Sequence, residues 1–419
     1  MVYYPQLTQK RKLSTMKKIV LSAATMIAVC SANAAGFGIY EASARGNALA
    51  GALVGSTRDA SAVYYNPANM TETTNVSFMV GSSFINPFCD VKVNGNAESK
   101  MNSGWFVVPT FYMIVPISED WRFGLGGYSE YGLGTKYGKY WALQNDTVET
   151  TIMQYTLNPN LSYKITDWWS IAGGIKMSYI SFNSKSHPFG AAAPGVEGEL
   201  DGHDYDIGYN FATDFKIRED LSFGLVYRSA IKHRIKGDYN MPGAGVASTL
   251  FALPGAPYPD HVPASAVLRL PQSITGGINW DVTKKLHLGF AATWTQWNSI
   301  SDIRFSMGPY YSKTEPLNWR NAWRFGWSGE YDVNDDFAVR LGYVHDRDPS
   351  ARYGTTMLPA GDRHIIGTGF GWYICKNLRW DVGYNFIIMQ NSTRTVKGQR
   401  FDCRNSFSHI VSTSISYSF

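Results

Sequence analysis

One stretch of the sequence, "YRSAIKHRIKGDY" from Tyr227, carries basic side chains at alternating positions. Arg228, Lys232, Arg234 and Lys236 all have even numbers, so an extended chain places them on one face. Alternation in later segments predicts that this face, taken as the interior, also holds Arg269, Arg320, Arg324, Arg340 and Arg363. Guanidinium and ammonium groups bind carboxylates, so the face predicts a site for an acidic ligand or ion pairs with interior acids. The candidate acids are Glu130, Asp204, Asp206, Asp214, Glu330 and Asp381.

Residues for covalent or metal chemistry lack a recognisable arrangement. The eight histidines fall in predicted loops or, like His409, on outward positions of predicted strands. No Ser/His pair has a spacing that indicates a shared nucleophilic site, and no paired CxxC or Cys/His cluster is typical of zinc. We therefore predict no catalytic residue, no metal and no cofactor.

Net charge argues against a nucleic-acid partner. The 419-residue chain has a formal charge of +5, but residues 1–34 contain five basic side chains and no acid. The remaining segment has 33 basic and 33 acidic side chains. A neutral mature chain offers no electrostatic reason to bind phosphate backbones.

The excess charge belongs to a leader. From Met16, "MKKIVLSAATMIAVCSANA" has two lysines, an apolar run from Ile19 to Cys30 and an Ala32-Asn33-Ala34 cleavage signal. We expect cleavage between Ala34 and Ala35, and residues 1–15 fit an extension from an upstream start. No later apolar run is long enough for a membrane helix, so a membrane location would require a closed barrel.

The C-terminal "SHIVSTSISYSF" shows the strand pattern most clearly. Its odd-numbered residues from Phe407 to Phe419 are mostly large and apolar, and its even-numbered residues are mostly serine. Period two predicts a strand with one lipid-facing and one polar side.

Read in this way, residues 75–419 divide into about fourteen such segments. Their connections alternate between short and long, as in outer-membrane barrels with short periplasmic turns and long external loops. The short links lie at 118–120, 166–167, 218–220, 283–285, 334–336 and 376–377, and the long links at about 89–103, 135–149, 185–202, 238–262, 306–317, 347–361 and 391–403.

Aromatic residues mark the short-turn rim of this predicted barrel. Trp121, Trp168, Trp169, Trp280, Tyr331, Tyr373 and Trp380 lie beside the short links, where a membrane-interface belt belongs. The predicted fold is therefore all-β, a transmembrane antiparallel barrel of 14 strands. A soluble all-β protein with aromatic strands is the alternative.

Strand order predicts the placement of the cysteines. The first strand runs outward from about Asn75, so Cys89 reaches the external rim near Cys403 at the start of the last strand. Because those strands are neighbours in a closed sheet, we predict a Cys89–Cys403 disulfide across the seam. Cys375 lies at the opposite rim and is predicted to be unpaired.

Residues 35–74 do not show the strand pattern of the barrel wall. The segment is rich in small residues and mixed in period, which favours a hatch inside the lumen. Within it, Asn66-Pro67-Ala68 predicts a helix start, because Asn is a good N-cap and Pro suits the first helical position.

Several motifs in order resemble the FadL family of outer-membrane transporters of long-chain fatty acids and hydrocarbons. They are "AGFGIYEASARG", the "NPA" at Asn66, "EYGLGT", "YRSAIKHRIKGDY", "WRNAWRFG", "LPAGDRHIIGTG" and the terminal Phe. The resemblance runs nearly end to end and implies a monomeric 14-stranded barrel with an N-terminal hatch. It also implies insertion into the Gram-negative outer membrane by the barrel assembly machinery.

The resemblance implies passive uptake of a hydrophobic ligand. The ligand would pass from a groove in the external loops to a lumen pocket, displace the hatch and leave sideways at the third strand. Phe37 and Ile39 resemble pocket residues, Arg320 matches a basic position of the tenth strand, and Arg324 and Arg363 are further ligand candidates. Gly124, Gly126 and Gly127 would permit the bend of the opening strand, although room for the hatch explains them equally.

The fifth strand lacks a clear counterpart of the second basic residue that the family pairs with the tenth-strand position, although Lys176 lies nearby. This difference leaves a channel for aromatic or other neutral hydrocarbons as the alternative. Other classes also stay open: an outer-membrane lipase, a hydrophilic pore and an adhesin.

Overall fold

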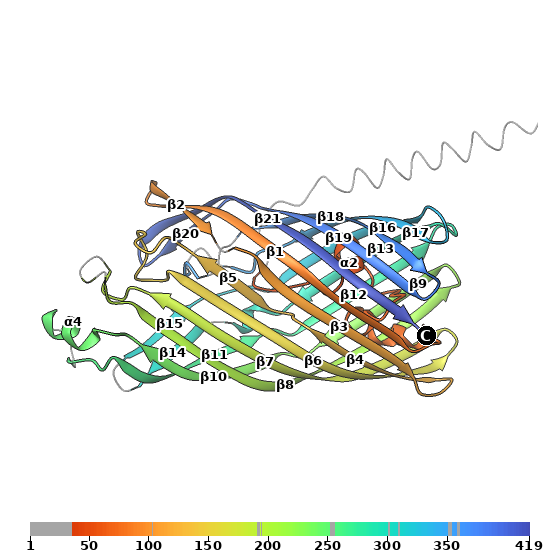
Figure 1. The fold of residues 1–419 in the computed structure, drawn as a ribbon, viewed down its shortest axis with the longest axis horizontal. Helices are drawn as coiled ribbons and strands as arrows, with labels where there is room; N and C mark the ends of the chain where they lie inside the picture. Colours follow the sequence, from red (N-terminus) through yellow and green to blue (C-terminus); the bar gives the residue numbers. More distant parts are fainter. Residues whose placement is uncertain are drawn as a thin grey trace, which may run out of the picture. The chain divides into compact units, whose positions relative to one another are not determined.

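The computed structural model describes residues 36–419, except 103, 191–192, 194, 252–255, 301, 309–310, 351–353 and 358–360. Within this part, strands form one antiparallel sheet that closes into a barrel of 14 strands (Figure 1). The first strand pairs with the last from Ser77↔Ser418 to Val93↔Phe401, so the sheet has no free edge at its seam. The predicted fold class is confirmed; the leader and its cleavage site lie outside the described residues.

The strands are built from 21 segments. Their bounds are β1 (Ser77–Val93), β2 (Asn96–Asn102), β3 (Phe106–Pro116), β4 (Trp121–Tyr128), β5 (Gly132–Lys136), β6 (Glu149–Thr166), β7 (Trp169–Ser186), β8 (Gly198–Arg218), β9 (Leu221–Arg228), β10 (Ile231–Asn240), β11 (His261–Leu270), β12 (Ser273–Asp281), β13 (Leu286–Thr295), β14 (Asp302–Met307), β15 (Tyr311–Pro316), β16 (Ala322–Asp332), β17 (Phe337–Asp346), β18 (Arg363–Cys375), β19 (Leu378–Met389), β20 (Ser392–Val396) and β21 (Gln399–Ser418).

Seven strands each consist of two segments separated by an irregular stretch. The pairs are β2/β3, β4/β5, β9/β10, β11/β12, β13/β14, β15/β16 and β19/β20. An irregular stretch can reverse which residues face the lumen, and this reversal decides several site residues below.

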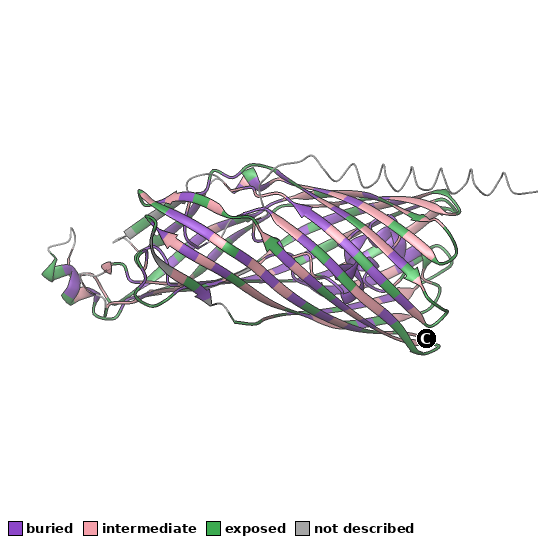
Figure 2. Cartoon of the chain, turned by 90° about the horizontal axis from the view of Figure 1, so that it is seen from above, coloured by how far each residue is buried: buried purple, intermediate pink, exposed green. Residues whose placement is uncertain are grey.

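Exposure alternates along the strands, as period two predicts (Figure 2). In β21, Val411, Ile415 and Tyr417 point outward, whereas Ser412 and Ser414 are buried. The Ser412 hydroxyl and Ser83 of β1 both accept hydrogen bonds from the Asn47 side chain, at 2.5 and 3.0 Å. The serine face of the last strand therefore holds the hatch.

The short-turn rim follows the expected pattern, whereas the opposite rim departs from it in three places. The six short turns occur where predicted, and Trp121, Trp168, Trp280, Tyr331 and Tyr373 beside them are exposed. At the other end, three expected loops are instead strand hairpins that extend the wall: β1–β2, β14–β15 and β20–β21. The Asn94-Gly95 and Lys397-Gly398 turns have positive φ at both positions, which matches the twist of paired strands.

Short helices inside the barrel form the hatch. They are α2 (Ala44–Ala48), α3 (Ala62–Tyr65) and the 3₁₀ helix η1 (Pro67–Glu72); the external α4 (Ala244–Leu250) and η3 (Trp297–Ser299) lie elsewhere. None of the described helices is long and apolar enough to cross a membrane. Asn66 caps η1 by accepting from the Ala68 amide at 3.0 Å, with Pro67 in the first turn, so the predicted helix start is confirmed.

The hatch touches the wall where side chains are missing. The Asn66 amide group also donates to Val54 O at 2.7 Å and to Thr213 O of β8 at 3.2 Å. A Cβ at Gly224 of β9 would collide with Val54 O and Asn66. Glycine at this position lets the hatch backbone approach the wall.

A buried ionic network anchors the hatch body. Arg45 of α2 binds Glu330 of β16 at 2.8 Å and Asp59 of the hatch at 3.2 Å. Glu330 also binds Arg340 of β17 at 2.5 Å, and Arg340 binds Asp381 of β19 at 2.7 Å. This network confirms that interior acids pair with lumen arginines, and low polarity around the ions makes each partner costly to remove.

The predicted lumen side is wrong for five basic residues. Lys232, Arg234 and Lys236 of β10 and Arg269 of β11 are exposed on the outer face. The irregular pairs Ser229-Ala230 and Pro271-Gln272 reverse the alternation, so these residues point away from the lumen although Arg228 points into it. Arg320 lies in the irregular stretch between β15 and β16 and is exposed.

Cys89 and Cys403 are both buried in one cluster at the seam, where their side chains interact, and the disulfide between them stays a prediction. The strands are neighbours as expected, but Cys403 opposes Val91, and Cys89 falls in a register shift between Phe88 and Asp90. The Ser406 hydroxyl donates to Cys89 Sγ at 3.0 Å. The bulge shifts the register by one position and leaves the Cys89 side chain beside that of Cys403. Cys375 is exposed at the opposite rim.

Replacing Arg45 with Ala is expected to loosen the hatch. The change leaves Glu330 buried with fewer cations, a loss of about 3–5 kcal/mol in the stability of hatch docking. Limited proteolysis of the inserted protein should then cleave the hatch faster.

Arg58→Ala is the matched control, since Arg58 is the hatch arginine that binds Asp281 at the solvent-exposed rim. Its expected loss is about 0–1 kcal/mol. Equal protection of the two variants would contradict a buried anchor.

Candidate ligand-binding and exit site

The third strand loses its neighbour halfway across the wall. β3 pairs with β4 from Pro116↔Arg122 to Phe111↔Gly127. Beyond that point, within the described residues, Phe106–Thr110 pairs only with β1, and β5 pairs only with β6. The wall between β3 and β5 therefore has no backbone ladder.

The start of the hatch occupies this break. The Ile39 amide donates to Glu130 O at 2.8 Å, and the Gly132 amide donates to Phe37 O at 3.0 Å. Gly38 and Tyr131 form an antiparallel bridge. The hatch thus supplies the strand partner that β3 does not supply.

A cavity of about 410 Å³ runs through the break. Its inner lining includes Phe37, Ile39, Ile387 and Ile410, and its outer lining includes Trp105, Val107, Met153 and Tyr155, which face lipid. Because residues of both faces of the sheet line one cavity, it reaches from the hatch segment to the membrane side of the wall. The apolar lining suits a hydrocarbon chain.

Glycines leave room inside the break. A Cβ at Gly132 would meet the Ile39 side chain, and a Cβ at Gly134 would meet the Phe106 ring. Gly124, Gly126 and Gly127, which the sequence suggested as the opening strand, lie in the regularly paired β4 just below it. Cβ atoms at Gly124 and Gly126 would meet Met70 and Val63 of the hatch, so these two make room for the hatch.

A second groove lies on the lipid side of the same region. It has a volume of about 720 Å³ and contains Phe111 of β3, Leu157 of β6, Met177 of β7 and Ile207 of β8. Tyr155 lines both this groove and the cavity through the break. A molecule that leaves the break would therefore meet an apolar groove before it reaches bulk lipid.

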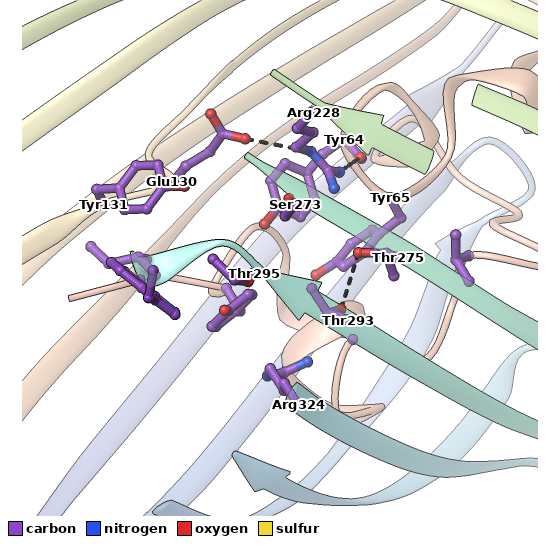
Figure 3. Close-up of a pocket in the computed structure, with 16 residues that line it drawn as sticks. Tyr64, Tyr65, Glu130, Tyr131, Arg228, Ser273, Thr275, Thr293, Thr295 and Arg324 are labelled. Atoms are coloured by element: carbon purple, nitrogen blue, oxygen red, sulfur yellow. Dashed lines mark hydrogen bonds and ion pairs between the residues drawn. The ribbon is translucent and has the colours of Figure 1, made fainter. Parts of the chain in front are cut away.

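A small polar cavity of about 50 Å³ lies on the lumen side of the hatch segment (Figure 3). Gly38, Ile39 and Tyr131 line both this cavity and the one that crosses the wall. The hatch segment therefore separates a polar chamber from an apolar one.

Arg324 of β16 points into the polar cavity, and the acids near it, its cross-strand partner Asp346 and Glu41, do not form an ion pair with it. Its guanidinium stacks on the Tyr40 ring at 4.3 Å, and its Nε lacks a hydrogen bond. Within the described residues no carboxylate lies within ion-pair distance of it, although its side chain is buried. A buried cation with an unused donor can accommodate an anion.

The other basic groups of this chamber are already neutralised. Lys176 of β7 binds Glu130 at 2.5 Å, and Arg228 of β9 binds Glu130 at 3.4 Å and stacks on Tyr64 at 4.7 Å. Glu130 belongs to the irregular stretch of the third strand, so this cluster fixes the position of the break. The sequence indicated Lys176 and Glu130 separately but not their contact.

Of the remaining predicted ligand residues, Phe37 and Arg363 line the apolar cavity, whereas Arg320 does not. Phe37 is buried against Tyr131, Trp297 and Trp319, with ring centroids 5.7, 5.3 and 5.9 Å away. Arg363 lines the apolar cavity and binds Asp346 at 3.1 Å. Arg320 lines neither chamber.

The sequence did not predict a hydrogen-bond chain of Ser178, His233 and Asp204. Ser178 Oγ lies 3.1 Å from His233 Nε2, and His233 Nδ1 lies 3.1 Å from Asp204 Oδ2. These residues sit on β7, β10 and β8 beside the irregular stretch between β9 and β10, and Asp204 also accepts from the Arg234 amide. The Ser178 hydroxyl also accepts from Gln154 at 2.9 Å and is buried, so the chain bridges a gap in the ladder.

External segments cover the lumen from the other side. Met357 packs in the core cluster that contains Phe37, and the Tyr137 hydroxyl donates to Thr356 O at 2.7 Å. Burial raises the pKa of Asp362, at the end of this segment, to about 7, and the neighbouring Asp348 adds to the rise. Asp362 also accepts from the Asp348 amide at 3.1 Å.

In the described part of the chain, no group of three His, Cys, Asp or Glu residues could hold a metal ion. The site thus consists of an apolar passage through the wall, a polar chamber with an unpaired cation, and a hatch segment between them. These features define a plugged transport barrel for hydrophobic compounds.

Comparisons with known proteins agree. Residues 25–419 match the model of the outer membrane protein transport protein family, OMPP1/FadL/TodX, and the chain belongs to this family. It is an outer-membrane protein of the FadL type, and the resemblance inferred from its motifs is confirmed.

Among its relatives is the long-chain fatty acid transport protein of Escherichia coli K12, 24% identical over 88% of this chain and 91% of that protein. A putative outer membrane protein of Neisseria meningitidis is 26% identical over 93% of this chain and 94% of its own length. A solved Pseudomonas aeruginosa FadL homologue superposes with a TM-score of 0.83, at 22% identity over 92% of this chain and 100% of its own. The toluene transporter TodX of Pseudomonas putida gives 0.69, at 15% identity over 92% and 99%.

We call the external segment that contains Thr356, Met357 and Asp362 the cover segment. We expect it to loosen as pH rises. The pKa of Asp362 is raised from about 3.8 to about 7 in the folded protein, so the closed form binds the extra proton between these values. The free energy that holds the segment closed should therefore fall from pH about 4 to about 7 and then level off.

Hydrogen exchange of the Asp348 amide measures this change, and Asp362→Asn should weaken the pH dependence of the exchange protection over that range, with the remainder coming from Asp348, whose pKa burial also raises. Protection that rises with pH, or a variant with an unaltered pH profile, would contradict the assignment.

Proposed function

We propose that the protein takes up long-chain fatty acids or related amphiphiles passively across the outer membrane. The observation that carries the proposal is a wall break sealed by the hatch backbone, with an apolar passage on one side and a buried unpaired arginine on the other.

The two chambers suit the two ends of such a molecule. Arg324 would bind the carboxylate, and Phe37, Ile39 and the apolar passage would enclose the chain, with Arg363 at its edge. Burial contributes about 0.8 kcal/mol per methylene, so a long chain supplies the energy to compete with the hatch segment for the same space.

Movement of the hatch segment would open the route outward. Two backbone hydrogen bonds hold Phe37–Ile39 to the third strand, whereas the hatch body is held by the buried Arg45 network. The segment can therefore leave while the body stays in place. The ligand would then pass sideways through the break into the lipid-side groove.

Neutral aromatic hydrocarbons are the second candidate. An aromatic cluster with edge-to-face contacts is formed by Phe37, Tyr131, Trp297 and Trp319. Such a cluster would suit an aromatic ligand without a carboxylate. The toluene transporter with the same fold supports this class in general.

A reversible lock tests the hatch mechanism. In a background with the native cysteines replaced by serine, Gly38→Cys and Tyr131→Cys place two thiols at bridge partners, a geometry that a disulfide accepts. Oxidation should stop uptake of radiolabelled oleate, and dithiothreitol should restore it.

Each single-cysteine variant serves as the control for side-chain loss. Uptake that continues in the fully oxidised double variant would refute displacement of this segment.

Replacing Arg324 with Gln separates the two ligand classes. Loss of a charge-assisted contact should weaken oleate binding by about 10- to 100-fold and leave binding of a neutral alkane or toluene unchanged. Isothermal titration of the purified barrel measures both.

Arg320→Gln is the matched control, because this neighbouring arginine is exposed and outside both chambers. A uniform loss for acid and hydrocarbon, or equal effects of the two variants, would refute a carboxylate site at Arg324.

A further inference from the structure

Four basic side chains project from the outer wall on adjacent strands. Lys232, Arg234 and Lys236 alternate along β10, and Arg269 of β11 lies beside them; all four are exposed. β10 and β11 lie toward the end of the barrel that carries α4, opposite the C-terminus (Figure 1). We call these four residues the basic patch.

The basic patch makes no ion pairs with the described residues. Within the described residues, none of its four side chains makes an ion pair or a hydrogen bond, in contrast to Arg304 of the next strand, which binds Asp302 at 3.1 Å. The acids of the same outer face lie at the end of the patch: Asp238 follows Lys236 along β10 and binds His261 at 3.5 Å, and Asp201 of β8 is the cross-strand partner of Asp238. The four positive charges are therefore not neutralised by ion pairs, although Asp238 and Asp201 lie at one end of the row.

The register brings like charges together. Lys232 and Arg269 are direct cross-strand partners, an arrangement that is destabilising without an anion between them. Along β10, successive outward residues are about 6.6 Å apart, so the patch forms a row about 13 Å long.

The patch lies at the height of a membrane surface. On the strand formed by β12 and β11, Trp280 marks the periplasmic rim, Ile278 and Ile274 face outward above it, and Arg269 is the next exposed side chain after the irregular pair. The eleven residue-to-residue steps from Trp280 to Arg269 span about 28 Å along the barrel axis, at about 3.3 Å per residue and a tilt of about 40°. The apolar band of such barrels is about 25 Å tall, so the patch reaches the headgroups of the outer leaflet.

Apolar side chains adjoin the patch. On β8, which pairs with β10 at His203↔Lys236, the outward residues Tyr205, Ile207 and Phe211 are 73%, 67% and 58% exposed. Tyr205 and Ile207 also line the lipid-side groove of about 720 Å³. A molecule with several acyl chains and an anionic head matches this combination.

We propose that the basic patch binds the phosphate groups of an anionic glycolipid of the outer leaflet, of the lipid A type, with its acyl chains over Tyr205 and Ile207. Phosphates form charge-assisted hydrogen bonds with Lys and Arg, and basic clusters at a membrane surface attract anionic headgroups. A single carboxylate would leave most of the row unpaired, whereas two phosphates carry enough charge to neutralise four cations.

Native mass spectrometry of the intact, processed barrel in detergent tests the proposal. Diphosphorylated lipid A should bind, and Lys232→Gln with Arg269→Gln should lower its affinity by about tenfold or more. Lipid A stripped of its phosphates should bind the wild type and this variant equally weakly.

The matched control is Lys284→Gln with Lys376→Gln, which removes two exposed positive charges at the periplasmic turns. This control should bind lipid A like the wild type. Millimolar inorganic phosphate should not displace the lipid.

Three results would overturn the proposal: equal affinity of patch and control variants, undiminished binding of the dephosphorylated lipid, or full displacement by inorganic phosphate. A folded barrel in each variant is verified by its heat-modifiable migration, so loss of structure cannot imitate loss of the site.

Discussion

The structure depends on one rule, that a backbone buried in a membrane must find hydrogen-bond partners within the protein. Closure of β1 on β21 satisfies the rule at the seam. Between β3 and β5 the wall violates it, and the hatch residues Phe37–Ile39 restore part of the missing ladder. The stopper and the opening are therefore one structural feature, since removal of the segment exposes the passage that it seals.

Electrostatics divides the hatch into a fixed part and a movable part. The body is tied to three strands by Arg45, Glu330, Arg340 and Asp381 in a buried network whose members are costly to separate. Its first residues rely on two backbone hydrogen bonds and aromatic packing around Phe37. Glu130 lies at the break in the wall, where its carboxylate binds Lys176 and Arg228 of neighbouring strands. Its backbone oxygen accepts the hydrogen bond from Ile39 of the movable part. This division explains how a ligand could move the tip without expelling the plug.

The period-two pattern predicted the barrel because strands can cross a membrane only as a closed sheet. Strand number, turns, rim aromatics and the helix start at Asn66 all followed from patterns of a few residues. The inner or outer placement of Lys232 and Arg269 did not, since two irregular residues at 229–230 or 271–272 reverse the alternation without a clear signal. The sequence did predict that Cys89 and Cys403 lie side by side at the seam, although not the bulge at Cys89. Contacts between distant segments, such as Lys176 with Glu130 or Ser178 with His233, depend on the exact register of the strands. The sequence alone did not predict them.

Amide hydrogen exchange at Ile39 and Gly132, in the lipid-inserted protein, tests the central claim most directly. These two amides donate the hydrogen bonds that hold the hatch segment across the break. Saturating oleate should speed their exchange, while amides in the hatch body, such as that of Asn47, keep their protection. Unchanged or stronger protection of Ile39 and Gly132 with ligand bound would show that the segment stays in place, and would contradict the account.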